Sequence, residues 1–187
     1  MKGKEKAIRR WEKAVEKGEA DESVVEIVEL INSSEDFYTT SSCGGRIVLC
    51  VSKDNDKESF RFLGKWHHKI TEKELRETLE NFDDEGTLWF KMEPFIFHIC
   101  GRNVETSSEI IREVKSIGLK SSGIFQTEKR VMFQVIGEDW LSVPVGEKGR
   151  TTISSKMIPM LVEKANKKME DNLERLEKFE KIIRQKT

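Results

Sequence analysis

The chain has 187 residues, a formal net charge of −1 and 36% charged side chains, where a typical domain has about a quarter. This length allows one domain with a sizeable core or two small lobes, and the near-zero charge excludes a uniformly basic nucleic-acid-binding protein. Three cysteines without zinc-ligand spacing, and no stretch near the ~18 apolar residues of a membrane span, predict no metal site, disulfide framework or membrane helix. The N-terminus is charged from Lys2 onward and lacks an apolar signal region, so a cytoplasmic protein is expected.

Two helices and a pair of strands are predicted at the start of the chain. Apolar residues at helical spacing indicate a helix over residues 4–17, and Asp21 opens a second one. Strands are predicted over 46–51 and 60–66, joined by a turn at Asp54-Asn55-Asp56.

A helix and a long strand are predicted next. Thr71 and Glu74 form a capping box, which starts a helix that ends near Phe82. Residues 88–99 are predicted to form a strand, kinked at Pro94 because proline cannot donate a hydrogen bond to a neighbouring strand.

The last part of the chain is predicted to hold a helix, three strands and a long helix. A second capping box, Thr106 with Glu109, starts the first of these helices, and Gly118 ends it. The long helix covers about residues 156–185, with Pro159 tolerated in its first turn. The three strands cover 123–126, 130–136 and 141–145.

This order of elements predicts an α+β fold. A Ser-Ser pair precedes a strand at residues 41–42 and again at 121–122, and each copy leads into a hairpin. We therefore expect one domain over residues 1–187. Two related β-rich halves, roughly 38–118 and 119–187, would form a single barrel-like sheet with flanking helices and the long C-terminal helix.

The first of two runs rich in functional groups lies at Tyr38–Ile47 and is called the first run below. It holds four Ser or Thr side chains, the thiol of Cys43, two glycines and Arg46. Small polar residues and glycines expose backbone N–H groups that hold anions, and arginine adds a planar fork for phosphate or carboxylate. The alternative is a polar turn entering a strand, in which the hydroxyls only satisfy loop backbone.

The second run, at Lys91–Arg102, is an apolar strand pattern that carries Glu93, His98 and Arg102. Glu93 precedes Pro94, which can free its side chain for chemistry, but a structural ion pair with Arg46 or Arg102 is an equal alternative. On spacing alone, a histidine at a position such as His98 is more often a hydrogen-bonded residue of the core than a residue that binds a substrate or donor.

Together the two runs resemble the family of the wybutosine-synthesising tRNA methyltransferase, the third protein of that pathway, in its archaeal form. The family pattern contains a Ser-Ser-Cys-x-Gly-Arg-Ile motif, a Trp…His element, a Phe-Glu-Pro-Phe-x-x-His-x-x-x-Arg motif, a Ser-Gly-Ile turn and an Asn-x-Lys-Met-Glu-x-Asn helix. The matching segments lie in the same order over nearly the whole chain. They are Ser41–Ile47, Trp66–His68, Met92–Arg102, Ser122–Ile124 and Asn166–Asn172.

The resemblance implies a methyltransferase with S-adenosylmethionine as donor and phenylalanine tRNA as substrate, methylating a ring nitrogen of a tricyclic guanine derivative beside the anticodon. The chain lacks the Gly-x-Gly-x-x-Gly motif of the common methyl-donor fold. Methyl transfer from a sulfonium needs alignment and at most one proton acceptor, so His68 and Glu93 are the candidate catalytic residues. Cys43 is expected to shape the pocket rather than act as a nucleophile. The expected donor- and substrate-binding residues are Ser41, Ser42, Cys43, Gly45, Arg46, Phe95, His98, Arg102, Ser122, Gly123 and Asn166.

Basic segments at both ends are candidates for the tRNA backbone, because residues 1–17 carry seven Lys or Arg and residues 145–187 carry eleven. Aromatic residues that could stack on a base extruded from its neighbours are Trp66, Phe95 and Trp89, of which Trp89 fits core packing better. The cations proposed to contact phosphates are Lys2 to Arg10, Lys148, Arg150, Lys164, Lys167 and Lys168.

Two other functions fit parts of the pattern. A non-catalytic module that presents the tRNA base to another enzyme would explain the missing glycine motif, and it would not bind S-adenosylmethionine. A small-molecule or phosphate-binding enzyme would use the same residues without binding tRNA.

Overall fold

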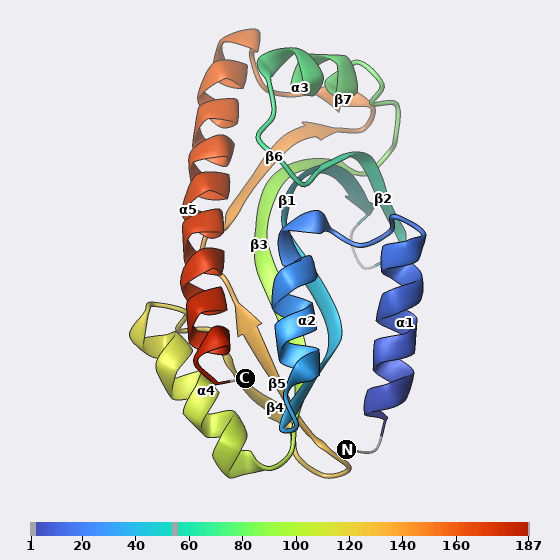
Figure 1. Ribbon diagram of the computed structural model, residues 1–187. Helices are drawn as coiled ribbons and strands as arrows, with labels where there is room; N and C mark the ends of the chain where they lie inside the picture. The colour runs from blue at the N-terminus through green and yellow to red at the C-terminus, as the bar shows by residue number, and fades with distance from the viewer. Residues whose placement is uncertain (1–2, 54–55, 187) are drawn as a thin grey trace. The chain divides into compact units, whose positions relative to one another are not determined.

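The computed structural model describes residues 3–53 and 56–186 of the chain (Figure 1). Asp54 and Asn55 of the expected turn, and Lys2 with its expected phosphate contact, therefore lie outside the described residues. The helices are α1 (Lys4–Glu16), α2 (Val25–Ser33), α3 (Glu72–Leu79), α4 (Val104–Ser116) and α5 (Ile158–Arg184), with 3₁₀ turns at Glu22–Val24 and Ser155–Met157. The strands are β1 (Phe37–Lys53), β2 (Asp56–Trp66), β3 (Thr87–Gly101), β4 (Gly123–Gln126), β5 (Val131–Ile136), β6 (Leu141–Glu147) and β7 (Arg150–Thr151).

The chain divides into two compact units, and neither is a single stretch of sequence. Unit 1 comprises Met1–Gly44, Phe95–Glu138 and Asn172–Thr187, and unit 2 comprises Gly45–Pro94 and Asp139–Asp171. β1, β3 and α5 each begin in one unit and continue into the other. The expectation of one domain built from two consecutive related halves stays a prediction.

Among the described residues, seven strands form one antiparallel sheet, so the α+β class is confirmed and the barrel is not. The main path runs β2-β1-β3-β5-β4, while β6 pairs with β3 and β7. β2 and β4 are its two ends and are not joined, and the expected barrel-like closure is therefore wrong. Closing a barrel requires pairing between the first and last strands of the path.

β3 changes partner at Pro94, where a kink was expected. Residues 87–92 pair with β6, and residues 96–101 pair with β5. Proline has no N–H to donate to a neighbouring strand. It is tolerated at Pro94 because the pairing with β6 has ended there and the pairing with β5 has not yet begun.

In unit 1, helices cover one face of the sheet. The core there joins β3 and β5 side chains to α2, α4 and the last turns of α5, with Phe97 packed at 5.2 Å between ring centroids against Phe179. α1 lies beside β1 (Figure 1). β1 pairs with β2 only from Ile47 onward in the described chain, and Arg10 of α1 donates to the carbonyl of Thr40 in the part of β1 before that point. α1 thus protects a strand edge.

Unit 2 has its own core beneath α3 and the first turns of α5. Phe90 and Met92 of β3 pack with Leu75 of α3 and with Ala165 and Met169 of α5, all essentially buried. This core holds β1 and β2 where they carry Arg46 and Phe62.

The helix ends test the capping predictions. Thr71 and Glu74 form the expected capping box at α3. The expected cap at Thr106 is wrong, because Asn103 caps α4 by accepting from the Thr106 N–H at 2.8 Å. Gly118 follows α4 with φ of 96°, a left-handed conformation that favours glycine.

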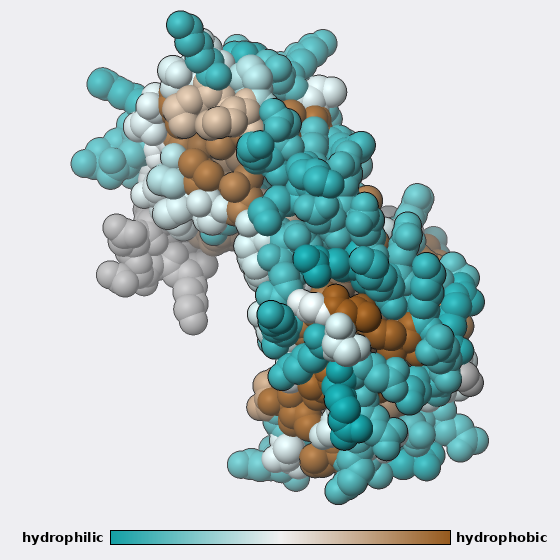
Figure 2. Space-filling view, turned by 90° about the vertical axis from the view of Figure 1, so that its left-hand side faces the viewer, coloured by the Kyte–Doolittle hydropathy of each residue, from teal (hydrophilic) through white to brown (hydrophobic). Residues whose placement is uncertain are grey.

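The side of the molecule shown in Figure 2 is mostly hydrophilic, and hydrophobic residues show on it only in separate spots. This fits the high fraction of charged residues. Over the described residues, no helix has the length and apolar character needed to cross a lipid bilayer.

Candidate active site

The first run is a continuous strand, not the polar turn or loop that the sequence suggested. All of Tyr38–Ile47 lies within β1. The two glycines explain how a strand accommodates this sequence. A Cβ on Gly44 would lie 1.9 Å from Ser23 Oγ and 2.8 Å from Asp21 Oδ2, and Gly45 has φ of 100°. The first glycine permits a close approach, and the second turns the strand.

Polar side chains hold Gly44 on both sides. Its N–H donates to Asp21 Oδ2 at 2.8 Å, and its carbonyl accepts from Asn172 Nδ2 at 2.7 Å. Asn172 is fully buried, and its Oδ1 accepts from the Phe95 N–H at 2.7 Å. One asparagine of α5 therefore ties the first run to the second run within unit 1.

Asn166 makes a similar clamp in unit 2. Its Nδ2 donates to the Ile70 carbonyl at 2.8 Å, and its Oδ1 accepts from the Ile70 N–H at 2.9 Å. The amide is thus used to fix the segment that precedes α3. Its expected role towards the pocket stays a prediction.

The two runs meet in unit 2 through Arg46 and Glu93. Arg46 Nε donates to Glu93 Oε2 at 2.8 Å, with about 30% and 25% of the two side chains exposed. The guanidinium also lies over the exposed ring of Phe62, 5.0 Å from its centroid. The structure thus shows the arginine ion pair weighed as an alternative for Glu93, and it leaves both groups accessible to solvent.

The two runs meet again in unit 1 through His98. Ser41 Oγ lies 2.9 Å from His98 Nδ1 in a hydrogen bond, and Thr40 Oγ1 donates to the His98 carbonyl at 3.1 Å. The His98 ring packs edge-on against the ring of Phe125, with 5.4 Å between centroids. His98 is half-buried and not enclosed in the core.

Two histidines lie after β2, and His67, which is not among the expected site residues, contacts the first run. His67 Nδ1 lies 3.1 Å from the Gly45 carbonyl, whereas His68 Nδ1 lies 2.8 Å from the carbonyl of Lys69. A carbonyl only accepts, so in each ring Nδ1 donates and the lone pair of the neutral imidazole is on Nε2. The only sequence signal for His67 was its position beside His68, and only His68 matches the histidine of the family pattern.

The remaining expected site residues are spread over unit 1. Gly123 lies opposite Gln134, which lies opposite His98, so one row across the sheet connects two of the expected residues. Ser122 is buried, and its Oγ accepts from the Ile136 N–H at 3.2 Å. Arg102 pairs with Asp36 at 2.8 Å at the end of β3.

Phe95 lies in the core, which leaves it no face for a base. It is fully buried and stacks on Phe179 of α5, with 6.1 Å between centroids. Its position after Pro94 made it look like part of the pocket, but the Asn172 contact turns the backbone, not the ring, towards the first run. Cys43 is half-buried, and none of the three cysteines forms a disulfide.

The cations expected to contact phosphates differ in their surroundings. On α5, Lys164 pairs with Glu163 at 3.0 Å, and Lys167 pairs with Asp171 at 2.9 Å. On α1, basic side chains line a groove of about 670 Å³ in unit 1. No acidic residue lines it, although Arg9 pairs with Glu5 of the same helix at 4.0 Å. The residues that line this basic groove are Gly3, Lys6, Ala7, Arg9, Arg10, Lys13, Tyr38, Thr40 and Arg130.

Comparison with known proteins places the chain among tRNA-modifying enzymes. Residues 2–185 match the family model described as Methyltransferase TYW3. The tRNA(Phe) 7-((3-amino-3-carboxypropyl)-4-demethylwyosine(37)-N(4))-methyltransferase of Thermococcus sibiricus is 30% identical over 96% of this chain and 92% of its own length. The enzyme of the same name, numbered 1, from Pyrococcus horikoshii is 31% identical over 97% and 93%.

Two solved structures have a similar fold. The PH1069 protein from Pyrococcus horikoshii superposes with a TM-score of 0.90 at 31% identity, covering 97% of this chain and 94% of its own. A hypothetical protein from Aeropyrum pernix shares the fold, with a TM-score of 0.77 at 24% identity over 88% and 98%. From the family match over nearly the full length, this chain belongs to the Methyltransferase TYW3 family.

Proposed function

We propose that this protein methylates N4 of 7-(3-amino-3-carboxypropyl)-4-demethylwyosine at position 37 of phenylalanine tRNA, with S-adenosylmethionine as the donor. The reaction is that of the relatives from Thermococcus sibiricus and Pyrococcus horikoshii, as their names give it. The observation that carries the proposal is the similarity over almost the whole length of both chains, which includes both runs.

The chemistry of the unit 2 cluster suits the proposed donor. S-adenosylmethionine carries a carboxylate, an ammonium, a sulfonium and an adenine ring. Arg46 offers a guanidinium for the carboxylate, Glu93 offers a carboxylate for a cationic group, and Phe62 exposes 39% of its surface for stacking. When bound, the donor would supply an electrophilic methyl group on sulfur.

The protein's own part is to orient groups and to accept a proton. Arg46 and Glu93 hold each other in place, so their positions are set before any ligand arrives. His68, with its Nδ1 committed to the Lys69 carbonyl, presents Nε2 as a proton acceptor. Ser41, Ser42 and Cys43 contribute small polar groups in unit 1, where Ser41 and His98 are hydrogen-bonded.

The test uses phenylalanine tRNA from cells that lack this methylation. The tRNA is incubated with the protein and S-adenosylmethionine, digested, and the modified nucleoside is weighed by mass spectrometry. We expect its mass to rise by one methyl group, with fragmentation placing that group at N4. A protein that binds this tRNA tightly yet transfers no methyl would instead be the non-catalytic module considered above.

A further inference from the structure

Among the described residues, one face of the sheet of unit 1 has a helix over one end only. Phe97 and Ile99 of β3 point into the helix-covered core, so the residues between them in sequence face the opposite side. Ala7 of α1 packs over one end of that side, against Tyr38, Cys100 and Met132. The rest of it, which carries Thr40, His98, Gln134 and Phe125, is called the open face here.

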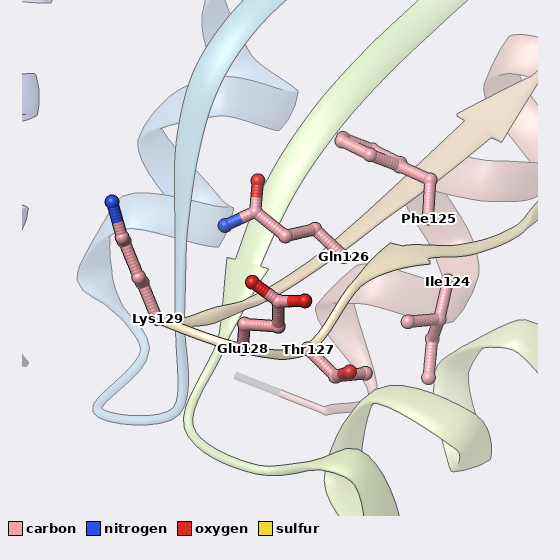
Figure 3. Close-up of a pocket in the computed structure, with 6 residues that line it drawn as sticks. All are labelled: Ile124, Phe125, Gln126, Thr127, Glu128 and Lys129. Atoms are coloured by element: carbon pink, nitrogen blue, oxygen red, sulfur yellow. The ribbon is translucent and has the colours of Figure 1, made fainter.

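Phe125 is the most unusual residue of the open face. It exposes 54% of its surface, although a phenylalanine on a four-residue strand is normally part of a core. The pairing of β4 with β5 shifts between Ile124 and Gln126, which makes Phe125 the extra residue of a β-bulge. Bulges re-aim side chains. In Figure 3 the ring of Phe125 points away from the side chain of Ile124 and towards the long strands.

The surroundings of Phe125 are those of a base-binding site. Its ring packs edge-on against the ring of His98, whose Nδ1 is hydrogen-bonded to Ser41. The Phe125 ring is therefore held in position while its faces stay uncovered. Gln134, next to His98 across the sheet, donates from Nε2 to the Ser121 carbonyl at 3.3 Å, and its amide oxygen adds an acceptor. A sheet surface with an exposed aromatic ring and nearby polar groups is how several RNA-binding domains stack and read unpaired bases.

The basic groove adjoins the open face, because Thr40 lines the groove and also donates to the His98 carbonyl. Of the nine residues that line it, five are cationic and none is acidic. In the described part of the chain, Lys6, Lys13 and Arg130 form no ion pair, although the whole protein is slightly acidic. Such a row of unneutralised cations matches a chain of phosphates.

We propose that unit 1 binds a single-stranded segment of RNA, with one unpaired base stacked on Phe125 over the open face and the adjoining phosphates held in the basic groove. The inference rests on the proposed function, because it takes the anticodon loop of the tRNA as the occupant. It assigns separate roles to two regions: Phe125 holds a base and the α1 cations hold the backbone.

The experiment measures affinity for an unmodified phenylalanine tRNA anticodon stem-loop over a range of salt concentrations. The groove variant is Lys6→Gln/Arg9→Gln/Lys13→Gln. The control variant, Arg112→Gln/Lys115→Gln/Lys178→Gln, makes the same change in charge on exposed side chains of α4 and α5 in the same unit. We expect the groove variant to lower the slope of log affinity against log salt by about one for each phosphate that it no longer neutralises, and the control to keep the wild-type slope.

The base contact is tested with Phe125→Leu and Phe125→Tyr. Leucine keeps an apolar side chain but removes the ring, so affinity should fall by roughly fivefold to a hundredfold, whereas tyrosine should restore it. Melting temperatures check that each variant is folded. An equal fall in affinity for the groove and control variants would overturn the groove, and wild-type affinity of Phe125→Leu would overturn the base contact.

A methyl-transfer assay on the same variants separates this inference from the proposed function. Normal methyl transfer with unaltered RNA binding in the groove and Phe125 variants would overturn the inference and leave the function standing. No methyl transfer by the wild-type protein, together with variants that bind RNA more weakly, would support an RNA site in a protein of another activity.

Discussion

At the scale of single residues, the contacts of Arg46 with Glu93 and Phe62 suggest a substitution that tests whether this arginine binds an anion. Lysine would keep the charge but remove the planar fork and the stacking on Phe62. We expect Arg46→Lys to weaken donor or tRNA binding at least several-fold while the melting temperature stays nearly unchanged, because a partly exposed pair adds little stability.

The matched control is Arg61→Lys in the same unit. Arg61 is exposed and pairs with Asp84 at 3.3 Å. Calorimetric titration with S-adenosylmethionine compares the two variants. A large fall in the melting temperature of Arg46→Lys with normal binding would identify the arginine as structural.

A second residue-scale prediction concerns the chemical step. Cys43→Ser should keep most of the single-turnover rate, because transfer of a methyl from sulfonium to nitrogen needs no covalent intermediate. His68→Ala and Glu93→Gln should lower it, and the loss of a general base typically costs about a hundredfold to ten-thousandfold. Saturating donor and tRNA remove binding defects from the comparison.

His67→Ala is the control that the structure adds to this series. His67 contacts the Gly45 carbonyl, and His68 does not. If His67→Ala abolished the single-turnover rate while His68→Ala kept it, the role of general base would be assigned to His67 instead of His68. An inactive Cys43→Ser with intact binding would require a role for the thiol.

Sequence reasoning found which residues carry functional groups better than it found what those groups contact. It paired Arg46 with Glu93 as one of two alternatives, and that contact exists. It missed Phe125, it left out His67 in favour of His68, and it counted Phe95 among the residues that could stack on a base. Exposure of Phe125 depends on a bulge between β4 and β5, and burial of Phe95 depends on Phe179 of a distant helix, which stacks on its ring. Such contacts between distant segments have no periodic signal in a sequence.

At the scale of elements, β1 shows how glycine extends a strand through a polar sequence. The run was expected to be a loop because hydroxyl residues and glycines are typical of turns. Two contacts override that preference: the Gly44 N–H donates to Asp21, and the Gly44 carbonyl accepts from Asn172. The helices were predicted closely, because their apolar spacing and caps are local signals.

The close approach at Gly44 gives the element-scale prediction. A Cβ there would lie 1.9 Å from Ser23 Oγ, and Ser23 and Asp21 are themselves hydrogen-bonded at 2.8 Å, so neither side chain can move without breaking that bond. We expect Gly44→Ala to lower the free energy of unfolding by about 1–3 kcal/mol, as overpacking does.

Gly123→Ala serves as the control for this change, because a Cβ at Gly123 meets no atom within 4 Å. Its free energy of unfolding should stay close to that of the wild type. Urea titrations of both variants provide the measurement. Equal stability of Gly44→Ala and the wild type would mean that α2 and its 3₁₀ turn shift away from β1 at little cost.

At the scale of the whole molecule, near-neutral net charge and RNA binding are compatible because the charges are segregated. The acidic stretch at residues 19–36 lies mostly on and around α2, whereas the basic groove is lined from α1. A protein with this arrangement binds a polyanion through one region and does not attract it everywhere.

Tyr38, the single tyrosine of the chain, links this groove to the stability of the protein. Its hydroxyl lies 3.4 Å from the guanidinium of Arg130. Burial raises the pKa of the Tyr38 hydroxyl, and the Cys100 side chain adds to the rise, while Arg130 opposes it. A pKa that is higher in the folded than in the unfolded protein makes stability depend on pH.

The direction of that dependence is fixed. Below about pH 10, the usual pKa of tyrosine, the hydroxyl is protonated in both states and its contribution to stability is complete. Above it the unfolded chain ionises first, so stability falls as the pH rises through the folded pKa. We expect wild-type unfolding free energy to fall more steeply above about pH 10 than that of Tyr38→Phe, since lysines titrate alike in both.

Ultraviolet absorbance of the phenolate follows the same group directly, because no second tyrosine contributes to it. The native protein should titrate at a higher pH than the protein in denaturant, and RNA in the groove should leave that order unchanged. If the native and denatured titrations coincided, Tyr38 would be in contact with solvent, and the packing of α1 against β1 that forms one wall of the groove would have to be abandoned.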